Sequence, residues 1–268
     1  MKTSEFFAPL LRRLLITVSV LALSACAGMQ ETKVQPLATA YDETAVLASD
    51  MRIAESALQS GDLEVARPIY ARLIKSHPEM SGPWMGLADS HFLAGELQAA
   101  KLAYAEAAGR FPDLIEPRLG LGRIALQQRD LALAVDIYQQ ALEQWPGHPL
   151  ALAGLGVAHD LGGRHEEAQA IYRQGLRSNS DNVALRNNLG LSLALSGKAR
   201  EAINILLGNT GLSGRLPQEE GNLALAYGLL GRDDAAESVL LANQSLGSTQ
   251  DNLEFYRYVR QQLGHNRR

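Results

Sequence analysis

An alanine recurs six times along the chain at a constant interval. The six positions are Ala66, Ala100, Ala134, Ala168, Ala202 and Ala236. A fixed period of this length indicates a repeat array, in which each unit buries its apolar face only by stacking on its neighbours. We therefore expect the 268 residues to fold as a row of similar units rather than around one central core.

Each unit carries the same pattern around its alanine. An aliphatic residue stands thirteen positions before it and is followed at once by a small residue, as in Leu87 and Ala88. A glycine stands five positions before the alanine, except in the third unit, which has Arg129. Small residues let two helices approach closely, and glycine accepts the left-handed conformation that ends a helix. Four positions after the alanine stand Tyr70, Tyr104, Tyr138, Tyr172, Leu206 and Leu240.

This pattern resembles the tetratricopeptide repeat (TPR), in which one helix–turn–helix unit fills each period. Its best copy contains Trp84, Leu87, Ala88, His91, Ala100, Tyr104 and Pro112. The resemblance implies an all-α solenoid of six repeats and a C-terminal capping helix. The expected repeats are 47–80, 81–114, 115–148, 149–182, 183–216 and 217–250, and the capping helix and tail are 251–268.

Three places depart from regularity. Arg129 should leave the turn of the third repeat strained or differently shaped, at a cost of about 1–2 kcal/mol. The second helix of the fifth repeat should stop at Gly208, and a loop should run to Pro217. In the capping helix we expect Asp251 as the N-cap. Its apolar stripe should consist of Leu253, Tyr256, Val259 and Leu263.

The N-terminal 25 residues have a basic start followed by ten uncharged residues, Leu14 to Leu23. That length fits a secretory signal and is too short for a bilayer span. The chain's one cysteine, Cys26, follows in "LSAC", which resembles the lipobox of bacterial lipoproteins. The resemblance implies removal of 1–25, a diacylglyceryl group on the sulfur and an N-acyl chain. The alternative is an ordinary signal peptide with a chance cysteine.

The residue after a lipobox cysteine often sets the destination of a lipoprotein. Here it is Ala27, which resembles an outer-membrane address. Residues 26–46 are expected to form the lipidated N-terminus and a tether, since 27–40 show no helical apolar stripe and include Pro36. Residues 41–46 are expected to extend the first helix.

Little in the sequence points to chemistry. The formal net charge of −4 argues against a nucleic-acid partner. The G-x-G pairs in "GLGRIAL" and "GLGVAHD" lie inside expected helices and lack a third glycine. The histidines are scattered, without metal-ligand spacing. We therefore expect no enzyme, metal, small-molecule substrate or cofactor, apart from the covalent lipid on Cys26.

A solenoid offers instead a concave groove built from its first helices, suited to an amphipathic helix or an extended peptide. The alternative is that some apolar members pack only against neighbouring repeats. The paired lysines of the carboxylate-clamp TPR subfamily are missing, which disfavours an acidic chain terminus as partner. The candidate partner-binding residues are Met85, Asp89, Phe92, Leu119, Arg123, Leu126, Val157, Asp160, Leu161, Asn187, Asn188, Leu191, Asn222 and Leu225.

The C-terminal third contains "LRNNLGLSLALSGKAREAINIL", "NLALAYGLLGRDDAAE" and "DNLEFYRYVRQQ". These phrases resemble the TadD lipoproteins of the tight-adherence (Tad, or Flp) pilus machinery. The resemblance implies a periplasm-facing assembly factor of the outer membrane, which assists a secretin or another pilus component. One alternative is a TPR lipoprotein of another envelope machine, such as a type IV pilus pilotin, a cell-wall enzyme adaptor or an export factor. A periplasmic enzyme is the remote alternative.

Overall fold

The computed structural model describes residues 43–208, 217–242 and 244–265. The expected signal, Cys26, most of the tether and the loop 209–216 lie outside these residues. Contacts divide the chain into residues 1–47 and residues 48–268, and the paired helices of the repeats belong to the second unit.

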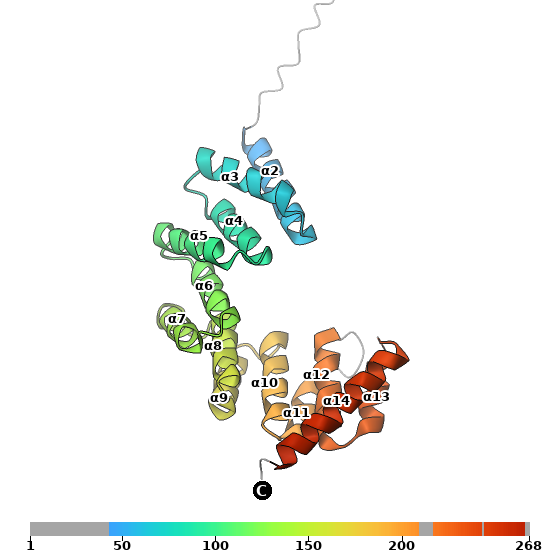
Figure 1. Cartoon of the computed structure of the whole chain (residues 1–268). Coiled ribbons are helices and arrows are strands. Elements are labelled where there is room, and N and C mark those ends of the chain that lie inside the picture. The colour runs from blue at the N-terminus through green and yellow to red at the C-terminus, as the bar shows by residue number, and fades with distance from the viewer. Residues whose placement is uncertain (1–42, 209–216, 243, 266–268) are drawn as a thin grey trace, which may run out of the picture. The chain divides into compact units, whose positions relative to one another are not determined.

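The described residues form thirteen α-helices and no β-strand, which confirms the all-α expectation (Figure 1). The helices are α2 (Glu43–Ser60), α3 (Leu63–Ser76), α4 (Ser81–Leu93), α5 (Leu97–Arg110), α6 (Glu116–Gln127), α7 (Leu131–Gln144), α8 (Pro149–Leu161), α9 (His165–Ser178), α10 (Val183–Leu195), α11 (Ala199–Leu207), α12 (Pro217–Leu230), α13 (Asp233–Leu240) and α14 (Leu246–His265).

The helices of residues 48–268 are arranged as successive hairpins (Figure 1). The second helices α5, α7, α9 and α11 each pack between two first helices. Thus α5 contacts both α4 and α6, and α7 contacts both α6 and α8. Neighbouring first helices also touch, from α4 through α6, α8 and α10 to α12. We call the surface made by these first helices the A face. Its continuity follows from the repeat period, which no insertion interrupts between Ala66 and Ala236.

The repeated alanines form the centre of each hairpin. All six have no exposed surface, as expected for residues at which two helices cross closely. In the first four repeats, the tyrosine one turn later fills a space that a glycine leaves open. A Cβ atom added to Gly156 would lie 2.2 Å from the Tyr172 ring, and one added to Gly120 would lie 2.5 Å from the Tyr104 ring.

The turn of the third repeat is strained rather than reshaped. Arg129 has a φ of 62°, in the left-handed range of the glycines that occupy this place in the other repeats. The Asp130 N–H donates to the Ala125 carbonyl at 3.0 Å, as the corresponding residue does in the other turns. The arrangement of the array therefore imposes on arginine a conformation that costs about 1–2 kcal/mol.

The C-terminal end corrects one prediction. Helix α14 begins at Leu246, so Asp251 lies inside the helix and cannot be its N-cap. The Ser245 hydroxyl instead accepts a hydrogen bond from the Ser248 N–H at 3.4 Å. The expected stripe is present, because Leu253 and Tyr256 are each 6% exposed and the two later members are half-buried.

Helix α14 packs on both α12 and α13, as a capping helix should. Arg257 and Arg260 pair with Asp233 of α13 at 2.7 and 3.0 Å. Hydrogen bonds from these guanidinium groups hold the pKa of Asp233 below its usual value. At the preceding irregular repeat, α11 ends at Leu207, directly before Gly208, as the sequence predicts.

Substituting glycine by alanine should have opposite effects at two helical positions. In Gly156→Ala the new methyl group meets the fully buried Tyr172 ring, so we expect a loss of about 1–3 kcal/mol. In Gly109→Ala the methyl group meets nothing within 4 Å, and better helix propensity should stabilise by up to about 1 kcal/mol. Urea denaturation followed by circular dichroism measures both. Equal effects would contradict the tyrosine–glycine packing.

Candidate binding groove on the A face

A groove of about 410 Å³ lies on the A face. Its wall comes from four first helices, α4, α6, α8 and α10, and from one residue of the second helix α7. We call it the A groove. It is lined by Met85, Asp89, Glu116, Leu119, Arg123, Leu126, Tyr138, Leu150, Ala153, Gly154, Val157 and Asn188.

Seven of the fourteen candidate residues from the sequence line this groove. They are Met85, Asp89, Leu119, Arg123, Leu126, Val157 and Asn188. Sequence reasoning missed five others, for two of which the period gave a signal. Ala153 stands one repeat period after the candidate Leu119, and Gly154 stands one repeat period before the candidate Asn188. Carrying each candidate position through every repeat would have found both.

The apolar part of the groove is only partly covered by protein. Leu119 is 9% exposed, whereas Leu150 at the start of α8 is 56% exposed. Met85, Leu126 and Val157 are half-buried. Aliphatic side chains left open beside a hydrophobic wall favour contact with another apolar surface, because water is then released from both.

Tyr138 reaches the groove from behind, through α7. Its ring lies between Gly122 and Gly154, where added Cβ atoms would come within 2.5 and 2.2 Å of it. The side chain is 2% exposed. Burial raises the pKa of Tyr138 to about 12, so the hydroxyl stays protonated at neutral pH. Tyr138 therefore supplies a hydrogen-bond donor to the groove.

Asp89 and Arg123 form an ion pair across two repeats. The Arg123 Nη2 atom lies 2.8 Å from Asp89 Oδ1 and donates to the Tyr104 hydroxyl at 2.8 Å. Tyr104 in turn donates to Asp89, and the guanidinium lies 4.8 Å from the centre of the Phe92 ring. These contacts join α4, α5 and α6. They also leave the Asp89 charge neutralised by a cation on the same wall.

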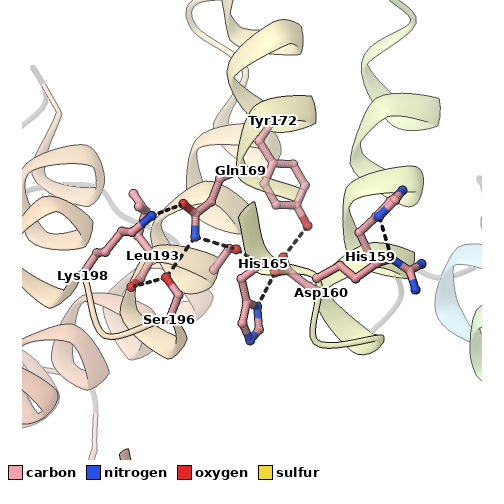
Figure 2. A network of polar contacts seen from close by, with 10 residues as sticks. His159, Asp160, His165, Gln169, Tyr172, Leu193, Ser196 and Lys198 are labelled. Carbon is pink, nitrogen blue, oxygen red and sulfur yellow. Dashed lines mark hydrogen bonds and ion pairs between the residues drawn. The ribbon is translucent and has the colours of Figure 1, made fainter. Parts of the chain in front are cut away.

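Asp160 has its partners within the protein, as Figure 2 shows. Its carboxylate accepts hydrogen bonds from the Tyr172 hydroxyl at 2.9 Å and the Ser192 hydroxyl at 2.6 Å. His165 Nδ1 lies 2.7 Å from the same carboxylate. Nearby, the buried Gln169 donates to the Ser196 hydroxyl at 2.9 Å. The expected partner-binding residue Asp160 thus joins α8, α9 and α10 and does not line the A groove.

The remaining candidates also lie outside the A groove. Asn222 donates to Asn187 at 2.9 Å, which links α12 to α10. Phe92 is stacked by Arg123. Leu225 packs against the buried cluster of the C-terminal repeats. The side chain of Leu161 is 42% exposed, and that of Leu191 is half-buried. Neither residue lines the A groove.

Within the described ranges, no three histidine, cysteine, aspartate or glutamate side chains come together as a metal site. Nor does any helix of that part combine the length and apolar character that crossing a membrane requires.

Two tetratricopeptide repeat profiles match the chain, at residues 51–115 and 125–189. The fold is similar to a chain of the crystallised APC/C hetero-tetramer Cut9–Hcn1, with a TM-score of 0.65 and 22% identity over 79% of this chain and 43% of that one. The match thus spans less than half of that longer chain.

A tetratricopeptide repeat protein from Parabacteroides merdae is similar with a TM-score of 0.61 and 16% identity, over 81% of this chain and 89% of that one. A thermophilic TPR protein of Thermus thermophilus is similar with a TM-score of 0.55 and 20% identity, over 67% of this chain and 98% of that one. No curated protein sequence matches. At these identities the likenesses show the fold alone.

The chain therefore contains tetratricopeptide repeats and has an all-α solenoid fold. Repeats of this kind generally mediate contacts between proteins and generally act as non-catalytic scaffolds. The groove on the A face is accordingly the candidate site for a protein partner.

Replacing Asp160 should affect stability rather than the A groove. Asp160→Asn puts an amide N–H₂ group, a donor, among three existing donors, so we expect a loss of about 1–3 kcal/mol in the free energy of unfolding. The matched control is Asp113→Asn, at an exposed position. Chemical denaturation measures both. An unchanged midpoint for Asp160→Asn would mean that the network contributes nothing to stability.

Proposed function

We propose that this protein is a lipid-anchored adaptor of the bacterial outer membrane, which faces the periplasm and holds a protein partner in the A groove. In the most specific form of the proposal, the partner is a secretin or another component of the Tad/Flp pilus, whose assembly or localisation the adaptor assists. The lipid on Cys26 fixes the adaptor to its membrane, and the groove raises the concentration of the partner there.

One observation supports partner binding most directly: the open apolar wall of the A groove. Leu126 and Val157 belong to different repeats but line the same groove, and neither is fully covered. A monomer gains nothing from leaving such side chains partly exposed along a continuous wall. A partner segment that covers them contributes about 25 cal/mol for each Å² of apolar surface removed from water.

The anchor and the system are supported by the sequence. A lipobox-like "LSAC" ending at Cys26 supports lipidation, and Ala27 supports export to the outer membrane. Three acyl chains, each CH₂ contributing about 0.8 kcal/mol, make anchoring permanent. The C-terminal phrases that resemble TadD lipoproteins support the Tad system over a type IV pilus pilotin or a cell-wall enzyme adaptor. Neighbouring genes for a secretin, a secretion ATPase and a small prepilin would distinguish these systems.

Charges placed in the groove should abolish partner capture. We expect the double variant Leu126→Asp/Val157→Asp to lose a partner that wild type captures from solubilised envelopes, because two desolvated carboxylates oppose apolar contact. The control is Val65→Asp/Leu102→Asp, at side chains that are 43% and 73% exposed on second helices. Both should keep their helical circular-dichroism signal. Full capture by the groove variant would move the binding site elsewhere.

Removing the thiol should release the protein from its membrane. Cys26→Ser has no sulfur to accept a diacylglyceryl group, so we expect the chain to stay uncleaved or to become soluble. Membrane fractionation on a sucrose gradient, with mass spectrometry of the N-terminus, measures both. Unchanged recovery of Cys26→Ser in the outer-membrane fraction would refute the lipid anchor, while the groove variants would still test partner binding.

A further inference from the structure

We propose that the A groove selects an extended segment of about eight residues that combines aliphatic side chains with a basic one, and that Glu116 pairs with the basic side chain. This inference rests on the proposed function, because it names the chemistry of the segment that the groove would hold.

One of the two carboxylates that line the groove has no cationic partner in the described residues. Three charged residues line it: Asp89, Arg123 and Glu116. Asp89 and Arg123 neutralise each other at 2.8 Å. Glu116 is exposed at the start of α6, and it has no hydrogen-bond or ion-pair partner among the described residues. The groove therefore carries one net negative charge beside its apolar wall, which attracts a cationic side chain and opposes an acidic one.

Two polar side chains that line the A groove have no hydrogen-bond partner within the described part of the protein. Within the described part of the chain, Tyr138 and Asn188 make no side-chain hydrogen bond, although both line the groove. Elsewhere on the A face the comparable side chains are paired, as in Asn187 with Asn222. A phenol and an amide left unpaired beside apolar residues are suited to the backbone carbonyl and N–H groups of an extended segment.

The span of the groove sets the length of the segment. The lining runs from α4 through α6 and α8 to α10, across three contacts between neighbouring first helices. Packed helices lie about 8–10 Å apart, so the three steps cover roughly 25–30 Å. At about 3.3 Å per residue, an extended segment of about eight residues fills that distance.

Glu116 can be tested against a matched control. It lies in the first turn of α6, where a negative charge also favours the helix dipole. Glu64 lies in the first turn of α3, is exposed and does not line the groove. Glu64→Gln therefore reproduces the loss of a first-turn charge without altering the groove. Any difference between Glu116→Gln and Glu64→Gln then reports on the ligand.

The experiment pans a phage library of random 12-residue peptides against the full chain in detergent. We expect the enriched peptides to combine lysine or arginine with aliphatic residues. For the best one, made synthetically, Glu116→Gln should weaken binding about 5- to 10-fold and Glu116→Lys more, with Glu64→Gln unchanged. Replacing the basic residue of the peptide by glutamine should lower affinity for wild type but not for Glu116→Gln, which a double-mutant cycle makes quantitative.

The outcomes separate this inference from the proposed function. Enrichment of acidic or uncharged peptides, or equal affinities for Glu116→Gln and Glu64→Gln, overturns the charge pairing. If Leu126→Asp/Val157→Asp still abolishes binding in that case, the groove remains the site. If neither Glu116→Gln nor the double variant changes the affinity, both proposals fall. A library that yields no peptide above background overturns both as well.

Discussion

The packing of the first four repeats depends on a tyrosine ring inserted where helices meet. Tyr138 fills the space beside Gly122 of its own hairpin and Gly154 of the next, and it leaves no room for a methyl group at either. One side chain thus sets the spacing within a repeat and between repeats. Because the same side chain lines the A groove, the contact that holds the helices together also determines one wall of the candidate site.

The constant repeat period predicted the fold, because the same small, aliphatic and aromatic residues return at each hairpin. It also predicted seven of the twelve residues that line the groove, since residues on one face of α4, α6, α8 and α10 repeat with the same register. It could not identify Tyr138, which reaches the groove from a second helix through the gap between two glycines. That passage exists only once the helices are packed.

Two further differences arise because packing overrides local preference. Arginine disfavours the left-handed region, yet Arg129 adopts it because the hairpins on both sides fix the turn. Asp251 is a good capping residue, yet α14 begins before it, at Leu246, and the additional turns bury Thr249 completely. Both differences depend on contacts with neighbouring helices, and a sequence pattern for a single helix or turn does not contain those contacts.

The polar residues of the A face fall into two groups with different consequences. Asp89, Asp160 and Asn187 are bound by partners from neighbouring helices, and these contacts tie successive repeats together. Glu116, Tyr138 and Asn188 line one groove and have no such partner in the described residues. Contacts of the first group hold together the helices that carry the second group, so a segment that binds there orders itself and the exposed Glu116 side chain, but not the helices. Preorganisation of this kind increases affinity without adding a contact.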